Sequence, residues 1–372
     1  MSGEELEPLS PRDAMEMWID RQRSEKASET VQSYFYRVRQ FVEWCESEGI
    51  ENLNELSTRD VYSYDSECRA QGLAQSTLNN QLGTIKIFLS FCADLNAVRE
   101  SIVTAVDVPS LVKDDRVNVE KLSTTRAEKV LELLSTYRHA SREHALFALA
   151  WESTARLGAL RSLDLGDCFL SDDDLDRLRH YPEIDDSEFE EIIREVESPF
   201  VYFRHREGTP LKNQYEGQRP VAISEDTVSV LRGYISVNRV QTTDREDRAP
   251  LFSSEKGSGR MSKSAIRRVF NIVTQPCRFG LDCPHGREIE ECEAREHGLE
   301  ARCPSSRSPH RVRTGSITDH RDRGWPPEVL AERANATPEV IRQHYDHPQQ
   351  LRRMESRRSF LTGDSSGGAD DE

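Results

Sequence analysis

Five side chains suited to phosphate chemistry are spread over residues 156–345 of this 372-residue chain. Paired arginines bind phosphate oxygens through their guanidinium forks, and a tyrosine oxygen can attack phosphorus to form a covalent ester. A lysine and a histidine add groups that can donate or accept a proton. Singly, each has an ordinary structural explanation on a solvated surface or in packing. They are Arg156 in STARLGAL, Lys212 in a polar turn, His310 and Arg313 in HRVR, and Tyr345 in RQHYDH.

The net charge of −16 argues, taken alone, against a nucleic-acid partner, because affinity for DNA depends on Lys and Arg that neutralise phosphates. The acidic residues, however, gather at both termini and in 172–197, whereas arginines gather in 302–323 and 352–358. An acidic chain that is rich in Arg and poor in Lys resembles proteins of salt-accumulating cells. DNA binding therefore stays open.

No stretch approaches the roughly 18 apolar residues of a membrane helix. The N-terminal MSGEELEPLSPRD also lacks the apolar core of a signal peptide. We therefore expect an intracellular, cytoplasmic protein with no membrane partner, in which disulfides are disfavoured.

The elements that would position the five residues are mostly helices. Residues 10–105 carry apolar side chains at helical spacing between Ser start signals and Gly stops, which predicts a compact four-helix unit. After a charged linker, residues 123–165 predict a helix, a turn and a second helix that contains Arg156. Further helices are predicted around 224–239, 262–273 and 326–345.

A small β-element is predicted between these helices. The segment PFVYFRHREGTPLKNQYEGQRPVAIS indicates two strands, Val201–Arg204 and Pro220–Ile223, joined by a long polar turn that holds Lys212. The preceding residues 171–198 are acidic and predict a surface insertion, and the tail 361–372 predicts disorder.

In this order, the features resemble the tyrosine recombinase (phage integrase-like) family, and in particular salt-adapted archaeal members with a Cys-rich insertion. TARLGAL resembles the family's first arginine box, RPVAI its R-x-V-P-L strand after the hairpin lysine, and HRVR its H-x-x-R box. The resemblance implies a mainly α fold with a small antiparallel β-sheet. It also implies an N-terminal helical core-binding (SAM-like) domain over 1–112 and a catalytic domain over 113–360.

The resemblance further implies a site-specific recombinase that cuts and rejoins double-stranded DNA through a 3′-phosphotyrosyl intermediate. Tyr345 would be the nucleophile, Arg156 and Arg313 would hold the phosphate, Lys212 would protonate the leaving 5′-oxygen, and His310 would carry the tyrosine proton. The chemistry needs no cofactor. The family acts on duplex DNA as a homo-oligomer, a dimer on one duplex and a tetramer on two.

Two positions depart from the family pattern. Ala159 stands where the first box usually has an acid, which affects local hydrogen bonding and not the assignment of Arg156. Asn335 stands where the family usually has His or Trp, about ten residues before Tyr345. An asparagine can donate a hydrogen bond to phosphate but cannot transfer a proton, so activity would be reduced or differently tuned.

Four of the eight cysteines fall in a polar segment, residues 277–303, which offers thiols little apolar cover. A structural zinc ion would supply the missing core, although the spacing is looser than a C-x-x-C pair. His285 or His297 could replace one cysteine, and inert cysteines or a disulfide stay open. The predicted ligands are Cys277, Cys283, Cys292 and Cys303; Cys45, Cys68, Cys92 and Cys168 are predicted core residues.

Two other functions stay open. The first is a DNA-binding relative with weakened catalysis, which Asn335 suggests and which the retained catalytic set argues against. The second is a zinc-dependent interaction module on a helical scaffold, for which residues 277–303 would be essential and Tyr345 would not.

Overall fold

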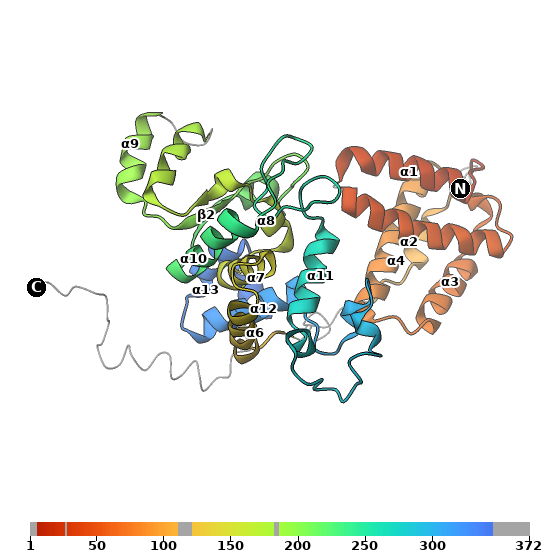
Figure 1. Cartoon of the computed structure of the whole chain (residues 1–372). Coiled ribbons are helices and arrows are strands. Elements are labelled where there is room, and N and C mark those ends of the chain that lie inside the picture. The colour runs from red at the N-terminus through yellow and green to blue at the C-terminus, as the bar shows by residue number, and fades with distance from the viewer. Residues whose placement is uncertain (1–5, 27, 111–120, 182–185, 345–372) are drawn as a thin grey trace, which may run out of the picture. The chain divides into compact units, whose positions relative to one another are not determined.

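The computed structural model describes residues 6–26, 28–110, 121–181 and 186–344. The chain divides into two compact units, residues 1–118 and 119–372, each with its own apolar core (Figure 1). The predicted boundary at residue 112 and the predicted disordered tail both lie outside the described residues. No helix in the described ranges is long and apolar enough to cross a membrane.

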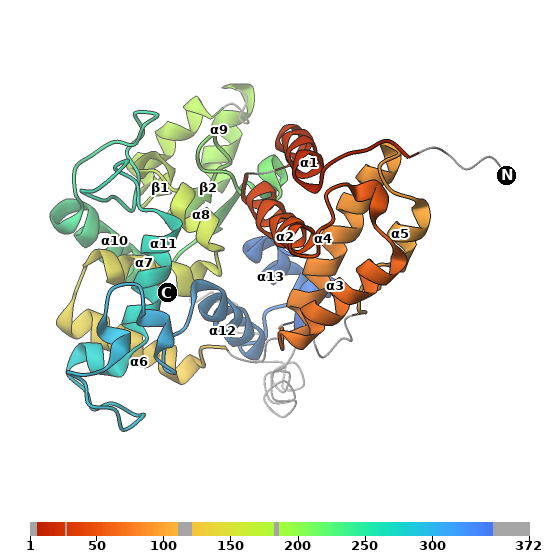
Figure 2. The ribbon, with the colours of Figure 1, turned by 90° about the vertical axis from the view of Figure 1, so that its right-hand side faces the viewer.

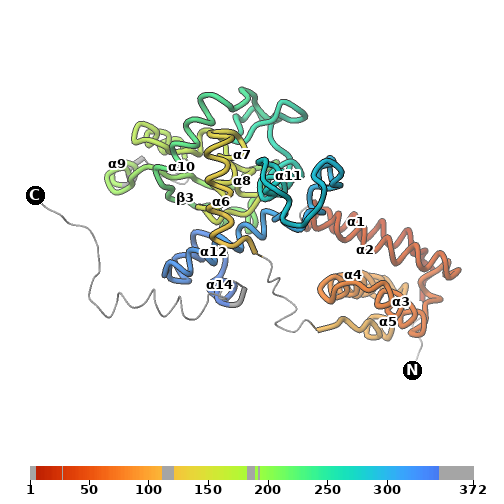
Figure 3. The backbone as a smooth tube through the Cα atoms, turned by 60° about the horizontal axis from the view of Figure 1, so that its bottom comes forward, coloured from red at the N-terminus to blue at the C-terminus, as the bar shows by residue number. Residues whose placement is uncertain are grey.

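The first unit is helical, with α1 and α2 lying side by side and α3, α4 and α5 grouped beside one another (Figures 2 and 3). Aromatic rings join the helices: Trp18 meets Phe88 edge-on at 5.6 Å between ring centroids. The four-helix prediction missed α5, because six residues are too few to display a helical period. The α-helices are α1 (Pro11–Glu25), α2 (Ser28–Ser47), α3 (Thr58–Ala70), α4 (Gln75–Asp94) and α5 (Glu100–Ala105), with the short helix η1 (Leu53–Glu55).

All four cysteines that were predicted to be core residues are buried and free, which confirms that prediction. Cys45, Cys68 and Cys92 belong to the core of the first unit, and Cys168 belongs to that of the second.

The second unit combines helices with one small sheet (Figure 1). Its amino-terminal part holds α6 (Thr124–Tyr137), α7 (Arg142–Ser153), α8 (Leu157–Ser162), η3 (Leu165–Asp167), η4 (Asp172–His180) and α9 (Asp186–Glu195). Its carboxyl-terminal part holds η5 (Gln214–Gly217), α10 (Glu225–Gly233), the π-helix η6 (Tyr234–Asn238), α11 (Lys263–Val273), α12 (Pro309–Asp322), α13 (Pro327–Ala334) and α14 (Pro338–His344).

The sheet has three antiparallel strands in the order β1 (Cys168–Phe169), β2 (Phe200–Phe203) and β3 (Arg219–Ala222). Val201 pairs with Val221 at its centre. The two predicted strands are present, each beginning one residue earlier than expected. Strand β1 was missed because two residues cannot show an alternating pattern.

The acidic segment 171–198 packs a small apolar cluster of its own. Phe189 of α9 is fully buried and belongs to the same cluster as Phe169 and Tyr181. The Arg179 guanidinium lies 3.8 Å from the centre of the Phe189 ring. The segment is therefore folded onto the sheet region through a few aromatic side chains despite its charge.

Two helix ends differ from the prediction. Arg156 does not lie inside a helix: α7 ends at Ser153, and Arg156 is the residue immediately before α8. The single helix predicted over 326–345 is divided at Asn335, whose φ of 49° ends α13. Asparagine tolerates this left-handed conformation better than most residues, and Pro338 then begins α14.

Candidate active site

The connection between α7 and α8 positions both predicted phosphate-binding arginines. Thr154 takes a left-handed φ of 54°, which turns the chain out of α7. Its carbonyl oxygen accepts a hydrogen bond from Arg313 Nη1 of α12. Arg156 follows two residues later, and Arg313 is only 3% exposed. The turn therefore orients a buried guanidinium from α12 beside the start of α8.

The carboxyl end of α13 binds the guanidinium groups of Arg156 and Arg219. Arg156 Nη1 donates to the carbonyl oxygens of Ala334, at 3.3 Å, and of Asn335. Arg219 of β3 donates from Nε to the Arg333 carbonyl oxygen at 2.8 Å. The last carbonyls of a helix lack intrahelical donors and carry partial negative charge, so they suit cationic partners. This helix end therefore aims two arginines at one region.

Asn335 ties the Lys212 turn to the same helix end. Its Nδ2 donates to the Lys212 carbonyl oxygen at 3.1 Å, and its Oδ1 accepts from Asn213 Nδ2 at 3.2 Å. Gly217 leaves room for this contact: a methyl group there would lie closer than 3.0 Å to both the Lys212 oxygen and Asn335 Nδ2. We call the contact between Asn335, Lys212, Asn213 and Gly217 the hairpin latch.

The site is strongly cationic. The pKa of Lys212 is lowered by the charge of Arg156, by burial, and by the charge of Arg313. The pKa of Arg219 is lowered to about 9, first by burial and then by Arg313, Arg156 and Arg333. Four predicted residues, Arg156, Lys212, Arg313 and Asn335, are thus brought together. Arg219 was not predicted as a site residue; the only signal was its place in RPVAI.

His310 and Tyr345 are the two remaining predicted catalytic residues. His310 is exposed in the first turn of α12, three residues before Arg313, as predicted for a helix start. Tyr345 follows the last residue of α14 and lies outside the described residues.

The cysteine-rich segment 277–303 contains short helical turns only, η7 (Pro276–Phe279), η8 (Glu293–Arg295) and η9 (Glu300–Arg302). Cys303 is buried, whereas Cys277, Cys283 and Cys292 are half-buried. Within the described residues, which include this whole segment, no three His, Cys, Asp or Glu side chains are placed to hold a metal ion. The zinc site therefore stays a prediction.

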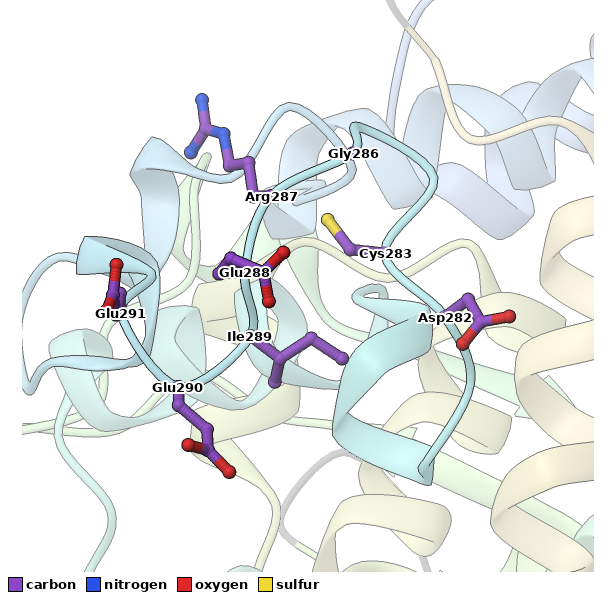
Figure 4. A pocket seen from close by; sticks show the side chains of 8 residues that line it. All are labelled: Asp282, Cys283, Gly286, Arg287, Glu288, Ile289, Glu290 and Glu291. Atoms are coloured by element: carbon purple, nitrogen blue, oxygen red, sulfur yellow. The ribbon is translucent and has the colours of Figure 1, made fainter.

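A hollow of about 450 Å³ lies along residues 282–291 of this segment. Figure 4 shows the Cys283 thiol and the Glu288 carboxylate projecting into the space enclosed by the loop, whereas Glu290 points away from it. His285, predicted as an alternative ligand, instead shares a hydrogen bond with Ser305 Oγ at 2.8 Å. Cys283 is thus the one predicted ligand that lines this hollow.

The first unit matches a known domain family. Residues 15–94 match the family model of the phage integrase N-terminal SAM-like domain. The chain is 26% identical over 149 residues to a tyrosine recombinase XerC of Bacillus pumilus, a match that spans 39% of this chain and 47% of the relative. It is 22% identical over 309 residues to a probable integrase/recombinase protein of Methanocaldococcus jannaschii, covering 82% of this chain and 76% of the relative.

Solved structures share the fold over most of the chain. The Tn1549 transposon integrase in complex with a circular intermediate DNA matches with a TM-score of 0.59 at 13% identity, covering 95% of this chain and 99% of that one. A lambda integrase dimer bound to a COC′ core site matches with a TM-score of 0.54 at 11% identity, covering 98% and 99%.

The chain has a SAM-like helical unit, followed by a mainly helical unit with a three-stranded antiparallel sheet and a cluster of arginines. It shares this fold with the solved integrase structures. The first unit thus matches the phage integrase N-terminal SAM-like domain, and the chain is similar in sequence to tyrosine recombinases and integrases.

Proposed function

We propose that this protein is a site-specific DNA recombinase or integrase that cuts and rejoins double-stranded DNA through a 3′-phosphotyrosyl intermediate. The observation that carries the proposal is the gathering of Arg156, Lys212 and Arg313 at one place, close enough for both arginine charges to lower the lysine pKa. Such a group of cations suits a phosphodiester whose oxygens gather negative charge in the transition state.

In the proposed reaction, the Tyr345 oxygen attacks phosphorus and gives its proton to His310. The P–O bond to the 5′-oxygen breaks, and that oxygen takes a proton from Lys212, whose lowered pKa makes it a better acid. Arg156 and Arg313 stabilise the charge on the non-bridging oxygens. A 5′-hydroxyl from another strand then attacks the phosphotyrosine and gives its proton to Lys212. The Tyr345 oxygen leaves and takes its proton back from His310, so the strand is rejoined without water or an external energy source.

The proposed partner is duplex DNA, with several copies of the chain assembling on it. Support comes from two structural neighbours, a transposon integrase in complex with DNA and a lambda integrase dimer on a core site. We propose a dimer on one duplex and a tetramer on two.

The test is covalent trapping of the protein on a nicked duplex that carries its target site. We expect wild-type protein to form an adduct, and Tyr345→Phe to form none while retaining DNA affinity. Tyr215→Phe is the matched control, because Tyr215 is an exposed tyrosine on the Lys212 turn. An adduct with Tyr345→Phe would refute the nucleophile; a wild-type protein that binds DNA without forming an adduct would favour the weakened relative.

We propose separately that residues 277–303 bind a structural zinc ion through Cys277, Cys283, Cys292 and Cys303. The proposal rests on four thiols in a segment without regular structure, three of them half-exposed. Hydrogen bonds hold part of the segment together, from Gln275 Nε2 to the Glu300 carbonyl oxygen at 2.9 Å and from Arg278 to the Ala294 carbonyl oxygen at 2.9 Å. Metal analysis of purified protein should find about one zinc per chain; much less would refute the site.

A further inference from the structure

Arg219 is held in a defined orientation beside the proposed active site. Its strand, β3, pairs with β2, and its guanidinium carbon lies 4.8 Å from the centre of the Phe203 ring. Nε donates to the Arg333 carbonyl oxygen at 2.8 Å, and Nη1 donates to the Gly217 carbonyl oxygen at 3.0 Å. The ring and the two carbonyl groups therefore fix the plane of the guanidinium group.

One donor of this fixed group remains unused. Arg219 Nη2 is buried and has no hydrogen-bond partner among the described residues. A buried N–H group without an acceptor costs free energy comparable to a lost hydrogen bond, and more when the group is charged. An acceptor for Nη2 must therefore come from outside the described residues.

Among the residues that the structure describes, no carboxylate offsets the charge of Arg219. Burial and the charges of Arg313, Arg156 and Arg333 hold its pKa at about 9. Arg206 is a useful comparison in the same unit: burial lowers its pKa too, but Asp167 and Asp164 outweigh that effect and raise it. One guanidinium group thus has its counter-ions built into the protein, whereas the other faces three arginines.

We propose that Arg219 is a third phosphate-binding arginine, which donates from Nη2 to an oxygen of the same phosphate that Arg156 and Arg313 hold. A phosphate group supplies both the missing acceptor and the missing negative charge. The inference deepens the proposed function by adding a residue to its site, but anion binding does not itself require strand cleavage. The two can therefore be tested apart.

The experiment is titration of the full chain with inorganic phosphate. The ionic strength is kept constant, because a rise in salt concentration would itself screen the charges at the protein surface. Arg219→Met keeps the apolar stem over Phe203 and removes the charge. We expect it to weaken phosphate binding roughly ten- to hundredfold, the range of one charge-assisted hydrogen bond. Arg206→Met is the matched control: it breaks an ion pair in the same unit and should leave phosphate affinity unchanged.

Arg219→Gln serves if the Met variant does not fold, because its amide can still donate to the Arg333 carbonyl oxygen while the charge is lost. Wild-type phosphate affinity in either folded variant overturns the inference. Loss of phosphate affinity in Arg219→Met, in a protein whose wild type forms no covalent adduct, supports the inference and counts against strand transfer. If the wild type forms the adduct and Arg219→Met binds phosphate with unchanged affinity, strand transfer is supported and the inference about Arg219 is overturned.

Discussion

Asn335 is the residue at which the chain departs most from the usual recombinase pattern, and its contacts suggest how the site manages without His or Trp there. The side chain donates to the Lys212 carbonyl oxygen and accepts from Asn213, so both ends of its amide are engaged by the Lys212 turn. The sequence left open a direct bond from Asn335 to phosphate. The observed contacts favour a positioning role, in which Asn335 acts through Lys212.

Asn335→Ala should therefore slow strand cleavage without weakening DNA binding. The two lost hydrogen bonds are worth about 1 kcal/mol each, and a misplaced Lys212 should reduce the cleavage rate by about tenfold. Single-turnover cleavage of a nicked duplex measures the rate, and hydrogen exchange over residues 211–218 reports loosening of the turn. The control is Asn238→Ala, whose amide donates to the Ala140 carbonyl oxygen at 2.9 Å. Unchanged cleavage in Asn335→Ala would exclude the positioning role.

The resemblance to the recombinase family predicted Arg156, Lys212, Arg313 and Asn335 as site residues, and the structure places these four close to one another. They were predictable because each sits in a short motif with neighbours that mark it. Arg219 and Gly217 were not predicted as site residues. Their roles depend on close approaches between segments more than 100 residues apart, which no local pattern records.

The site is formed mainly by helix ends and by the turns between elements, and less by the interiors of helices or strands. Long helices with clear apolar periods were predicted, as were β2 and β3 to within one residue. The short elements α5 and β1 were missed, and so was the break between α13 and α14. That break matters most, because the carbonyl groups exposed at the end of α13 accept the bonds from Arg156 and Arg219.

The hairpin latch predicts how the turn between β2 and β3 depends on its contact with the end of α13. Gly217→Ala should push the Lys212 turn away from Asn335, because the added methyl group would lie closer than 3.0 Å to both partners. We expect cleavage to fall about as much as in Asn335→Ala, and the double variant to be no slower than either single variant. Gly166→Ala is the matched control, since nothing lies within 4 Å of its added methyl group. Additive losses in the double variant would show that the two residues act independently.

The whole molecule has a net charge of −16, yet its second unit contains a cationic site. Carboxylates in that unit are paired elsewhere, as in the buried contacts of Arg260 with Asp164 and Asp244. Such pairs neutralise arginines that have a structural role. This unit also contains buried histidines. Burial favours their neutral form, so their protonation at low pH should destabilise the fold.

His144 in α7 provides the clearest case of this sensitivity. Burial, and to a lesser extent His139, lower its pKa from 6.5 to about 4, and its Nδ1 accepts a hydrogen bond from the Ala140 N–H. Because the unfolded chain takes up this proton first, the stabilisation is complete above pH 6.5 and is lost as the pH falls toward 4. We expect a loss on the order of 1–3 kcal/mol across that window for this buried ring.

Hydrogen exchange of α7, measured by mass spectrometry at several pH values, follows this loss without requiring the two units to unfold together. His144→Gln cannot take up the proton, so α7 should show a flatter dependence of protection on pH between 6.5 and 4. His139→Gln, at the exposed neighbour, should keep most of the wild-type dependence, because burial is the larger cause of the shift. An equally steep loss of protection in His144→Gln would assign the acid sensitivity to other groups, such as His320, whose pKa burial also lowers.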